Sequence, residues 1–378
     1  MEERKRVVLL GAGHANLQVL QGLVGYGVET VLVSEGEVAV YSGMVPGVIC
    51  GEYRPEEAMV QLGPLAVLCG AEFVPIRAIR LDPHSRIVTL EGGRTIAYDV
   101  LSVDIGSRSK GTDVPGVREH CLMTRPLIAL IKALEGLDRR ETPPKVVVVG
   151  AGAAGVELAF TFLRRFQAHF GPSFSLSLIH STDTILPGFP VSTQTRTQQL
   201  LHQAGISLLL STTVAAVHSS QVHLSNGQVI PADVTIWAAG AEPHDIALNV
   251  PLCKDGFMRV NQELQSVAFP EVFGGGDCIS IEGFNPGFPP KAGVYAVREG
   301  PIIAKNIIAM LEKRPLTTYW PQQGFLTLLN VGNGQAIGTK YGYSFSGTAV
   351  RRLKDSIDRK FMRKFDTANR QQSNCALF

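Results

Sequence analysis

A glycine-rich turn between an apolar strand and a helix occurs twice in this chain, and this duplication constrains the fold more than any other feature. The first turn, residues 11–16 (GAGHAN), follows the apolar run 7–10. The second, residues 150–155 (GAGAAG), follows the run 145–149, and helical periodicity continues after both turns. Since 139 residues separate the two turns, the repeat indicates a duplication of whole domains rather than a solenoid.

The second turn has the features of a dinucleotide-binding G-x-G-x-x-G motif. Gly150 permits the tight turn, Gly152 lets the backbone approach a pyrophosphate, and Gly155 permits close packing of helix on strand. The helix N-terminus adds free N–H groups and a partial positive charge. We therefore expect this turn to bind a nucleotide; a glycine-rich turn without a ligand is the alternative.

The first turn departs from the motif at one position. Gly11 and Gly13 match, but Asn16 stands where the third glycine would be, so either the helix lies further from the strand or Asn16 turns outward. Glu35, near the end of the next strand, suits an acid that bonds ribose hydroxyls, and Ser34 could share or replace that role. An ordinary loop acid is the alternative for Glu35.

The corresponding ribose position of the second unit holds a histidine instead of an acid. His180 and Ser181 lie there, with Asp183 just beyond. No acid is placed to select NADH and no arginine is placed to select the 2′-phosphate of NADPH, so the donor stays open. His180 as a plain surface residue is the alternative.

A β-hairpin and a buried strand follow each βαβ unit. Residues 87–98 and 222–230 have the pattern of hairpins, and each leads to an apolar strand. The sequence predicts an α/β fold of two Rossmann-like, three-layer ββα domains, the second inserted in the first, plus a small C-terminal α+β region. The expected boundaries are 1–140 with 246–320, then 141–245, then 321–378, with the linker at 138–144.

Composition excludes several classes of protein. A chain of 378 residues with 45% hydrophobic residues exceeds one ordinary core. A net charge of +2 gives no global field for nucleic acid, so no nucleic-acid partner is expected. The run 7–10 is too short for a signal peptide, and no run of about 18 apolar residues occurs. We expect a cytoplasmic protein whose mature form starts near Met1.

The six cysteines are scattered along the chain. They form no C-x-x-C and no C-x4-C pair, which argues against a disulfide framework or a zinc site, and no metal site is predicted. Most are expected to be small buried hydrophobes. They are Cys50, Cys69, Cys121, Cys253, Cys278 and Cys375.

Four further segments complete an order of motifs that resembles the pyridine nucleotide-disulfide oxidoreductase superfamily. Residues 98–107 and 232–240 look like its paired hairpin-to-glycine segments, and residues 152–157 resemble its NAD(P)H turn with a trailing acid. Residues 272–278 (VFGGGDC) look like its late FAD motif, whose aspartate bonds the ribityl or phosphate region. The resemblance covers nearly the whole chain and implies FAD in the first domain and NADH or NADPH in the second.

Within the superfamily, the chain is similar to the branch of type II NADH dehydrogenases and sulfide:quinone oxidoreductases. It most resembles the flavoprotein module often joined to selenide,water dikinase. That likeness rests on residues 41–47 (YSGMVPG), 290–298 (PKAGVYAVR) and 353–362 (LKDSIDRKFM).

The resemblance implies two sets of cofactor residues. FAD would contact Gly11, Gly13, Asn16, Ser34, Glu35, Gly106, Gly276, Asp277, Ala292 and Gly293. NAD(P)H would contact Gly150, Gly152, Gly155, Glu157, His180 and Gly240. A helix that begins at Ala292 and Gly293 would face the flavin pyrimidine and stabilise the anionic reduced flavin. Lys291 could add a full charge there, as the one catalytic candidate, or be a solvated lysine.

Three departures from related enzymes limit the chemistry. Disulfide reductases carry a C-x4-C pair near the flavin, whereas only Cys50 is present here, so dithiol chemistry is not expected. Sulfide:quinone oxidoreductases use cysteines that flank the flavin; Cys121 lies in a plausible region, but no second cysteine lies near Lys291. Type II dehydrogenases carry an Ala-Gln quinone-site motif, whereas Gly293 follows Ala292 here, which puts a quinone acceptor in doubt.

The segment 351–365 has the pattern of a basic amphipathic helix. Leu353, Ile357, Phe361 and Phe365 recur every four residues, and basic residues dominate the other positions. Such a helix could lie on the inner face of a membrane as a peripheral contact. We favour a terminal helix packed on its own protein with its basic residues solvated, because the stripe would also serve a core. Residues after Asp366 are expected to be disordered.

Together these patterns predict a FAD-dependent NAD(P)H dehydrogenase that passes electrons to a quinone or another small acceptor. One alternative is a sulfide- or selenium-linked flavoprotein oxidoreductase, which would need a cysteine near the flavin. Another is a non-enzymatic, flavin-binding redox sensor. The acceptor and the oligomeric state, a homodimer included, stay open.

Overall fold

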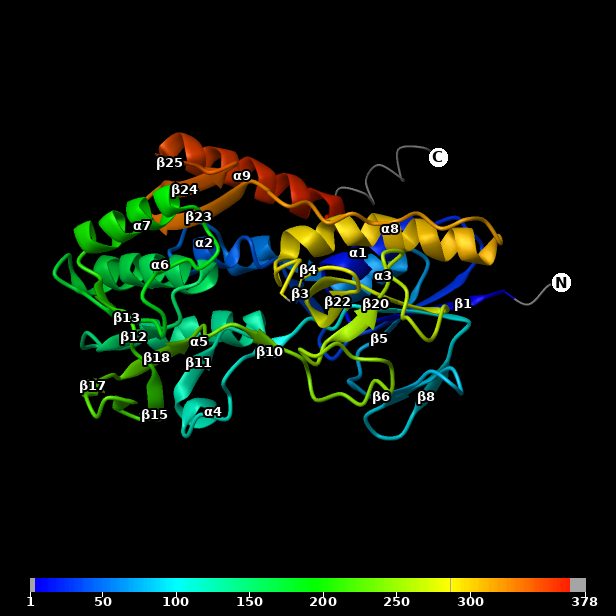
Figure 1. Cartoon of the computed structure of the whole chain (residues 1–378), viewed down its shortest axis with the longest axis horizontal. Helices are drawn as coiled ribbons and strands as arrows, with labels where there is room; N and C mark the ends of the chain where they lie inside the picture. Colours follow the sequence, from blue (N-terminus) through cyan, green and yellow to red (C-terminus); the bar gives the residue numbers. More distant parts are fainter. Residues whose placement is uncertain (1–3, 286, 368–378) are drawn as a thin grey trace.

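The computed structural model describes residues 4–285 and 287–367, and Figure 1 shows them arranged as two lobes. Each lobe is built around one of the two βαβ units, and the C-terminal region lies along one side of the molecule. The tail for which disorder is predicted lies, from residue 368 on, outside the described residues, as does Cys375.

Each lobe contains a five-stranded sheet in which every strand pair is parallel. The first sheet has the order β21-β9-β1-β2-β5, with β1 (Arg6–Leu10), β2 (Glu29–Val33), β5 (Glu72–Val74), β9 (Val100–Val103) and β21 (Val272–Gly274). The second has the order β11-β18-β12-β13-β14, with β11 (Cys121–Met123), β12 (Val146–Val149), β13 (Ser177–Ile179), β14 (Ser207–Leu209) and β18 (Val234–Trp237). The predicted α/β fold with two Rossmann-like units is confirmed.

Helices and short strands cover these sheets. The helices of the first lobe are α1 (His14–Gly22), α3 (Leu62–Leu68) and α8 (Gly293–Leu311), and those of the second are α4 (Val117–His120), α5 (Leu127–Asp138), α6 (Ala153–Phe170) and α7 (Val191–Gln203). Helix α2 (Val45–Ile49) packs against α6. The short strands are β3 (Val38–Val40), β4 (Met59–Gln61), β10 (Arg108–Ser109), β19 (Ala241–Glu242), β20 (Met258–Val260) and β22 (Ile279–Ile281).

The apolar runs at the start of each unit form central strands because both faces of each sheet are covered. The side chains of β1 from Val7 to Leu10 and all four of β12 are buried. A continuous run of this kind is typical of a parallel strand between two helical or sheet layers. The predicted hairpins are confirmed as parts of two antiparallel sheets, β6 (Ala78–Asp82) with β7 (Ile87–Leu90) and β8 (Thr95–Ala97), and β15 (Val214–His218) with β16 (Gln221–Leu224) and β17 (Val229–Pro231).

The chain enters the second lobe earlier than the sequence predicted. Strand β11 pairs with β18, and α5 contributes buried leucines to the core around α6. Residues 121–138 therefore belong to the second lobe, whereas the expected boundary assigned them to the first. The lobes are joined near β10 and β19, which pair with each other. A strand of three residues carries too little periodicity to reveal its sheet.

The C-terminal region is a small sheet that carries one helix. Strands β23 (Thr327–Gly332), β24 (Gln335–Lys340) and β25 (Tyr343–Gly347) form the sheet, β23 contacts α6, and α9 (Thr348–Met362) follows. In Figure 1, α9 runs along the edge of the molecule from the second lobe toward α8. The predicted small α+β region is therefore confirmed.

The buried face of α9 is charged, which differs from the expected apolar stripe. Leu353 and Ile357 are each 43% exposed, whereas Arg351, Lys354 and Asp358 are 7%, 6% and 3% exposed. The stripe is divided along its length, because Phe361 and Phe365 at its C-terminal end are buried. The expectation that the basic residues are solvated is wrong for Arg351 and Lys354.

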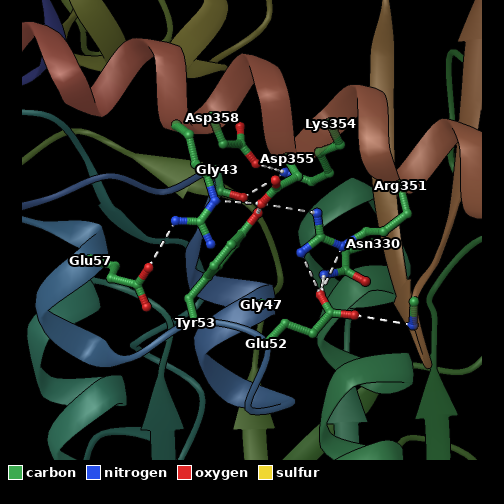
Figure 2. Close-up of polar contacts among 12 residues, drawn as sticks. Gly43, Gly47, Glu52, Tyr53, Glu57, Asn330, Arg351, Lys354, Asp355 and Asp358 are labelled. Carbon is green, nitrogen blue, oxygen red and sulfur yellow. Dashed lines mark hydrogen bonds and ion pairs between the residues drawn. The ribbon is translucent and has the colours of Figure 1, made fainter.

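Ion pairs and hydrogen bonds connect this charged face to the rest of the protein, as Figure 2 shows. The Lys354 ammonium donates to the Gly43 carbonyl at 2.6 Å and to Asp358 at 2.8 Å. The Arg351 guanidinium pairs with Glu52, the carboxylate of which also accepts from the Asn330 amide. Further contacts of α9 are Tyr53 with Asp355, Arg359 with Glu57, and Tyr41 with Asp358. The helix is thus fixed to the loop and helix that follow β3.

We predict that Gly155→Ala destabilises the second lobe. A methyl group there would overlap the carbonyl oxygen of Gly150, and forced overlap of this kind typically costs about 1–3 kcal/mol. The measurement is the midpoint of urea unfolding. Gly152→Ala is the matched control, because no atom lies within 4 Å of its added carbon; equal midpoints for the two variants would contradict the prediction.

We also predict that Lys354→Met lowers the free energy of unfolding by about 3–5 kcal/mol, because it leaves the Asp358 carboxylate buried without its cation. The same urea titration measures this loss. Lys360→Met, on the exposed side of the same helix, should leave the midpoint unchanged. An unchanged midpoint for Lys354→Met would show that the buried pair does not hold α9 in place.

Candidate functional site

The first glycine-rich turn connects β1 to α1, at the edge where the parallel strands end. Gly11 has a φ of +88°, and a Cβ there would overlap the backbone of Asp104, so only glycine fits. A Cβ at Gly13 would overlap the Asp104 carboxylate itself. The room that this second glycine leaves is therefore filled by a side chain from the end of β9.

The Asp104 carboxylate is bound to the N-terminus of α1. Its Oδ2 accepts hydrogen bonds from the N–H groups of Ala15 at 2.8 Å and Asn16 at 3.1 Å. The side chain is 2% exposed, and burial raises the pKa of Asp104 to about 7. Sequence reasoning missed this residue, because its partners lie 88 and 89 positions away in the chain.

The side chain of Asn16 points into the protein. It is fully buried, and its amide nitrogen donates to the carbonyls of Leu10, Gly11 and Ser102, while its oxygen accepts from the Ser102 hydroxyl. Of the two alternatives that the sequence left open, the outward orientation of Asn16 is therefore wrong. Asn16 joins α1 to the ends of β1 and β9, which accounts for the tolerance of a residue larger than glycine at this position.

The predicted ribose position of the first lobe is open to solvent. Glu35 follows β2, its carboxylate is 75% exposed, and the Arg77 guanidinium lies 4.0 Å away. Ser34 precedes it, half-buried, with its N–H bound to the Val74 carbonyl. This placement leaves the Glu35 carboxylate accessible to a ribose, and its contact with FAD stays a prediction.

The late FAD motif lies next to the first turn. A Cβ at Gly276 would overlap the Asp104 carboxylate, and the N–H of Gly276 donates to Glu299 of α8 at 2.6 Å. Asp277 accepts from Ser107 at 3.1 Å and pairs with Arg125 at 3.0 Å. Burial raises the pKa of Glu299 to about 8. The structure thus gathers three carboxyl groups at the predicted flavin site, of which the sequence identified only Asp277.

The start of α8 approaches the same turn. Ala292 is the N-cap and Gly293 begins the helix, and a Cβ at Gly293 would lie 3.9 Å from the His14 ring. Lys291, however, donates to the Ile279 carbonyl and lies 3.8 Å from the centre of the Phe257 ring. Its ammonium thus has partners in and beside β22, Ser280 included, and burial lowers its pKa.

An aromatic cluster joins the first turn to the C-terminal region. The Tyr41 ring stacks on Phe361 with centres 4.5 Å apart, and His14 contacts both rings. Among the described residues, the buried His14 Nε2 has no hydrogen-bond partner. Desolvation lowers the pKa of His14, so the ring is neutral near pH 7. His14 is not among the predicted site residues, because it occupies a variable position of the motif.

The second glycine-rich turn connects β12 to α6 and is open. Gly150 has a φ of +103°, and Gly155 packs on its carbonyl as predicted. Among the residues that the structure describes, no atom outside the turn itself lies within 4 Å of a Cβ built on Gly152, the N-cap of α6. The first N–H groups of any α-helix have no partner within the helix. This turn therefore presents free donors and space to an anion.

The two remaining predicted positions of the second site lie at the same edge. The imidazole Nδ1 of His180, which follows β13, accepts from the N–H of Ala151 at 3.1 Å. His180 is therefore part of the turn rather than a plain surface residue, and burial lowers its pKa. Gly240 follows β18 with a φ of +111°, and a Cβ built on it would lie 3.9 Å from the Cβ of Lys110, which is ordinary van der Waals contact. Gly106 has the equivalent place after β9, with a φ of +71°, and among the described residues no atom outside its own chain neighbours lies within 4 Å of a Cβ built on it.

Glu157 lies one turn into α6 and faces the C-terminal region. Its Oε1 accepts from the N–H of Asn330 at 2.7 Å. Burial raises the pKa of Glu157 to about 7, while the charge of nearby Lys354 lowers it. This acid therefore belongs to the contact between α6, β23 and α9, and its predicted contact with NAD(P)H stays a prediction.

The cysteines do not form a reactive site among the described residues. Cys121 begins β11 and pairs with Thr235 in the second sheet, and burial raises its pKa to about 12. Cys278 follows Asp277, but its buried thiol donates to the Val103 and Gly275 carbonyls, and burial raises its pKa. Raised pKa values keep both groups as thiols, the form that is a poor nucleophile.

The residues present fit a nucleotide better at the second turn than at the first. Gly150, Gly152 and Gly155 leave the N-terminus of α6 free for a pyrophosphate. At the first turn the glycines, Gly106 and the start of α8 fit FAD, but the Asp104 carboxylate takes the N–H groups that a phosphate would use. The backbone of the first site therefore has the shape to bind FAD, but the negative charge of Asp104 opposes binding of the FAD pyrophosphate.

Comparison with known proteins agrees with this arrangement. The family model described as pyridine nucleotide-disulphide oxidoreductase matches residues 5–300. Alternative NAD(P)H-ubiquinone oxidoreductase C1 of Arabidopsis thaliana is 27% identical over 364 residues, with 84% of this chain and 69% of the relative covered. Demethylphylloquinone reductase NdbB of Synechocystis sp. is 25% identical over 371 residues, with 92% and 90% covered.

A solved structure shows the same fold over nearly the whole chain. The sulfide:quinone oxidoreductase of Aquifex aeolicus superposes with a TM-score of 0.80 at 19% identity, with 96% of this chain and 91% of that chain covered. The chain belongs to the pyridine nucleotide-disulphide oxidoreductase family, in the branch that includes NAD(P)H dehydrogenases, as its motifs predicted.

Proposed function

We propose that this chain is a FAD-dependent NAD(P)H dehydrogenase that passes electrons to a quinone or a related small acceptor. The observation that carries the proposal is the open second turn, where Gly152 leaves space and free donors at the N-terminus of α6. Two relatives support the acceptor class, since their names are NAD(P)H-ubiquinone oxidoreductase and demethylphylloquinone reductase.

The residues of this chain would position cofactors rather than exchange protons with substrate. Bound FAD would supply the redox chemistry, accepting a hydride from the nicotinamide and returning electrons to the acceptor. The turn at Gly150 and Gly152 would hold the pyrophosphate of NADH or NADPH. His180 accepts a hydrogen bond from the Ala151 N–H. Because a histidine and not a carboxylate occupies this position, it would not repel the 2′-phosphate of NADPH, and the proposal includes both NADH and NADPH.

The aromatic cluster favours a flat acceptor such as a quinone. Tyr41 and Phe361 form a stacked pair next to His14, which lies beside Gly293 at the start of α8. Aromatic faces bind flat, apolar ring systems by stacking. The sulfide-linked alternative has less support, because Cys121 lies in the second sheet and not at the first turn.

We further propose a peripheral contact of α9 with an anionic membrane surface. Leu353 and Ile357 are exposed, and Lys360 and Lys364 lie on the same side of the segment. Apolar residues flanked by lysines suit the interface of a charged bilayer. Within residues 4–285 and 287–367, no helix combines the length and apolar composition needed to cross a membrane.

The donor reaction predicts a spectroscopic result. Anaerobic protein with bound flavin should lose its visible flavin absorbance when NADH or NADPH is added. Gly152→Val should keep the bound flavin but slow the bleaching at least about tenfold, since its side chain would enter the pyrophosphate space. A bound flavin that neither nucleotide reduces would contradict the proposed dehydrogenase.

The membrane contact predicts co-sedimentation with vesicles that contain phosphatidylserine. Replacing both Leu353 and Ile357 by Glu should weaken binding about tenfold, because two half-exposed aliphatic groups are lost. Val229→Glu, at another exposed apolar position on β17, is the control. Equal sedimentation of all three proteins would exclude α9 as the attachment site.

A further inference from the structure

The two glycine-rich turns are equivalent in backbone register, but the side chain that lies beside each turn differs. Leu10 pairs with Val103 in the first sheet, and Val149 pairs with Trp237 in the second. The next N–H of β9, on Asp104, donates to the Leu10 carbonyl at 2.8 Å, and that of β18, on Ala238, donates to the Val149 carbonyl at 2.8 Å. The register therefore makes Asp104 and Ala238 equivalent.

This equivalence explains why one turn is filled and the other open. The Asp104 carboxylate occupies the space next to Gly13. The equivalent space next to Gly152 contains no atom of the described residues within 4 Å of a Cβ built there, apart from the turn itself. Phosphates bind to helix N-termini through free backbone N–H groups. At α1 two of these groups, on Ala15 and Asn16, already donate to Asp104. At the first turn, the anion bound to the helix N-terminus is thus a side chain of the protein itself, the Asp104 carboxylate.

Within the described part of the chain, no cation beside Asp104 is free to keep its carboxylate charged when another anion arrives. Asp277 and Cys278 face it from the late motif, Glu299 from α8, and the neutral His14 ring lies on α1. Arg125 is paired with Asp277, and Lys291 is bound to the Ile279 carbonyl. A pyrophosphate added here would meet an ionised carboxylate at short range in a buried site, which is unfavourable.

We propose that Asp104 is an internal competitor of the flavin pyrophosphate, so that the first lobe takes up FAD together with one proton on Asp104. This inference rests on the proposed function, because it assumes that FAD is the ligand of the first turn. The proton neutralises the carboxylate, which then leaves the N–H groups of Ala15 and Asn16 to the phosphate. No electron is transferred in this step.

The direction of the pH dependence follows from the charge of Asp104. Its pKa is raised by burial to about 7, so the free protein holds the carboxylate ionised above that pH and protonated below it. FAD binding is therefore favoured at low pH and weakened as the pH rises. If only the protonated form binds, the dissociation constant increases about tenfold between about pH 6 and pH 8.

The test is a titration of flavin-free protein with FAD, followed by the quenching of flavin fluorescence at several pH values. Asp104→Ala installs the residue that the second turn has, and should bind FAD at least about tenfold more tightly than the unmodified protein at about pH 8. Asp104→Asn keeps the shape without the charge and should remove the pH dependence. Asp99→Asn is the matched control, because Asp99 caps the other end of β9 by accepting the Arg6 N–H at 2.8 Å.

The reciprocal variant tests the same idea at the second turn. Ala238→Asp should introduce a carboxylate beside Gly152 and weaken the binding of NADH at least about tenfold, measured by the change in NADH fluorescence. This variant keeps the test valid if the Asp104 variants fold poorly, since Asp104 also caps α1.

The outcomes separate the inference from the proposed function. FAD binding that is tight, independent of pH and unchanged in Asp104→Asn would overturn the inference and leave the dehydrogenase intact. A pH dependence that survives in Asp104→Asn and disappears in Glu299→Gln would assign the proton to Glu299 and also overturn it. If FAD binds to no variant at any pH, the proposed function fails as well.

Discussion

Free N–H groups at the start of a helix are the feature on which both halves of this molecule depend. Each βαβ unit brings such a helix to the edge of a parallel sheet, where the first turn of the helix has no partners of its own. At α6 they stay available, and at α1 the Asp104 carboxylate accepts two of them. The same strand–turn–helix unit therefore offers an anion-binding site at α6, whereas at α1 the helix is capped by a side chain of the protein itself.

The C-terminal region depends on a different constraint, the burial of charge. Arg351, Lys354 and Asp358 lie on the inner side of α9, where they pair with Glu52, Tyr41 and each other. Because unpaired buried charges are costly, these partners fix the rotation of the helix about its axis. In that orientation of the helix, Leu353 and Ile357 are exposed and Phe361 stacks on Tyr41. The position of the aromatic cluster is thus linked to the buried ion pair, because the Tyr41 hydroxyl donates to Asp358.

The sequence predicted what depends on local pattern. The two glycine turns, the hairpins and the parallel strands follow from residue spacing and apolar runs, and all are confirmed. It did not predict what depends on distant partners. β11 has only three residues, Asp104 caps a helix almost 90 positions away, and the period of α9 does not reveal which side faces inward. Asn16 is an intermediate case. The sequence shows that it replaces the third glycine of the motif, but only the structure shows that its side chain points inward and donates to backbone carbonyls.

The duplication also has a consequence for how two cofactors of similar chemistry are told apart. Both would bring a pyrophosphate to a helix N-terminus, so backbone shape alone cannot distinguish them. The equivalent positions after β9 and β18 differ by one carboxylate, Asp104 against Ala238. A nucleotide donor must enter and leave at every turnover, which suits the open turn. A flavin needs to bind only once, so its site can tolerate a competing charge, provided that the rest of its contacts outweigh it.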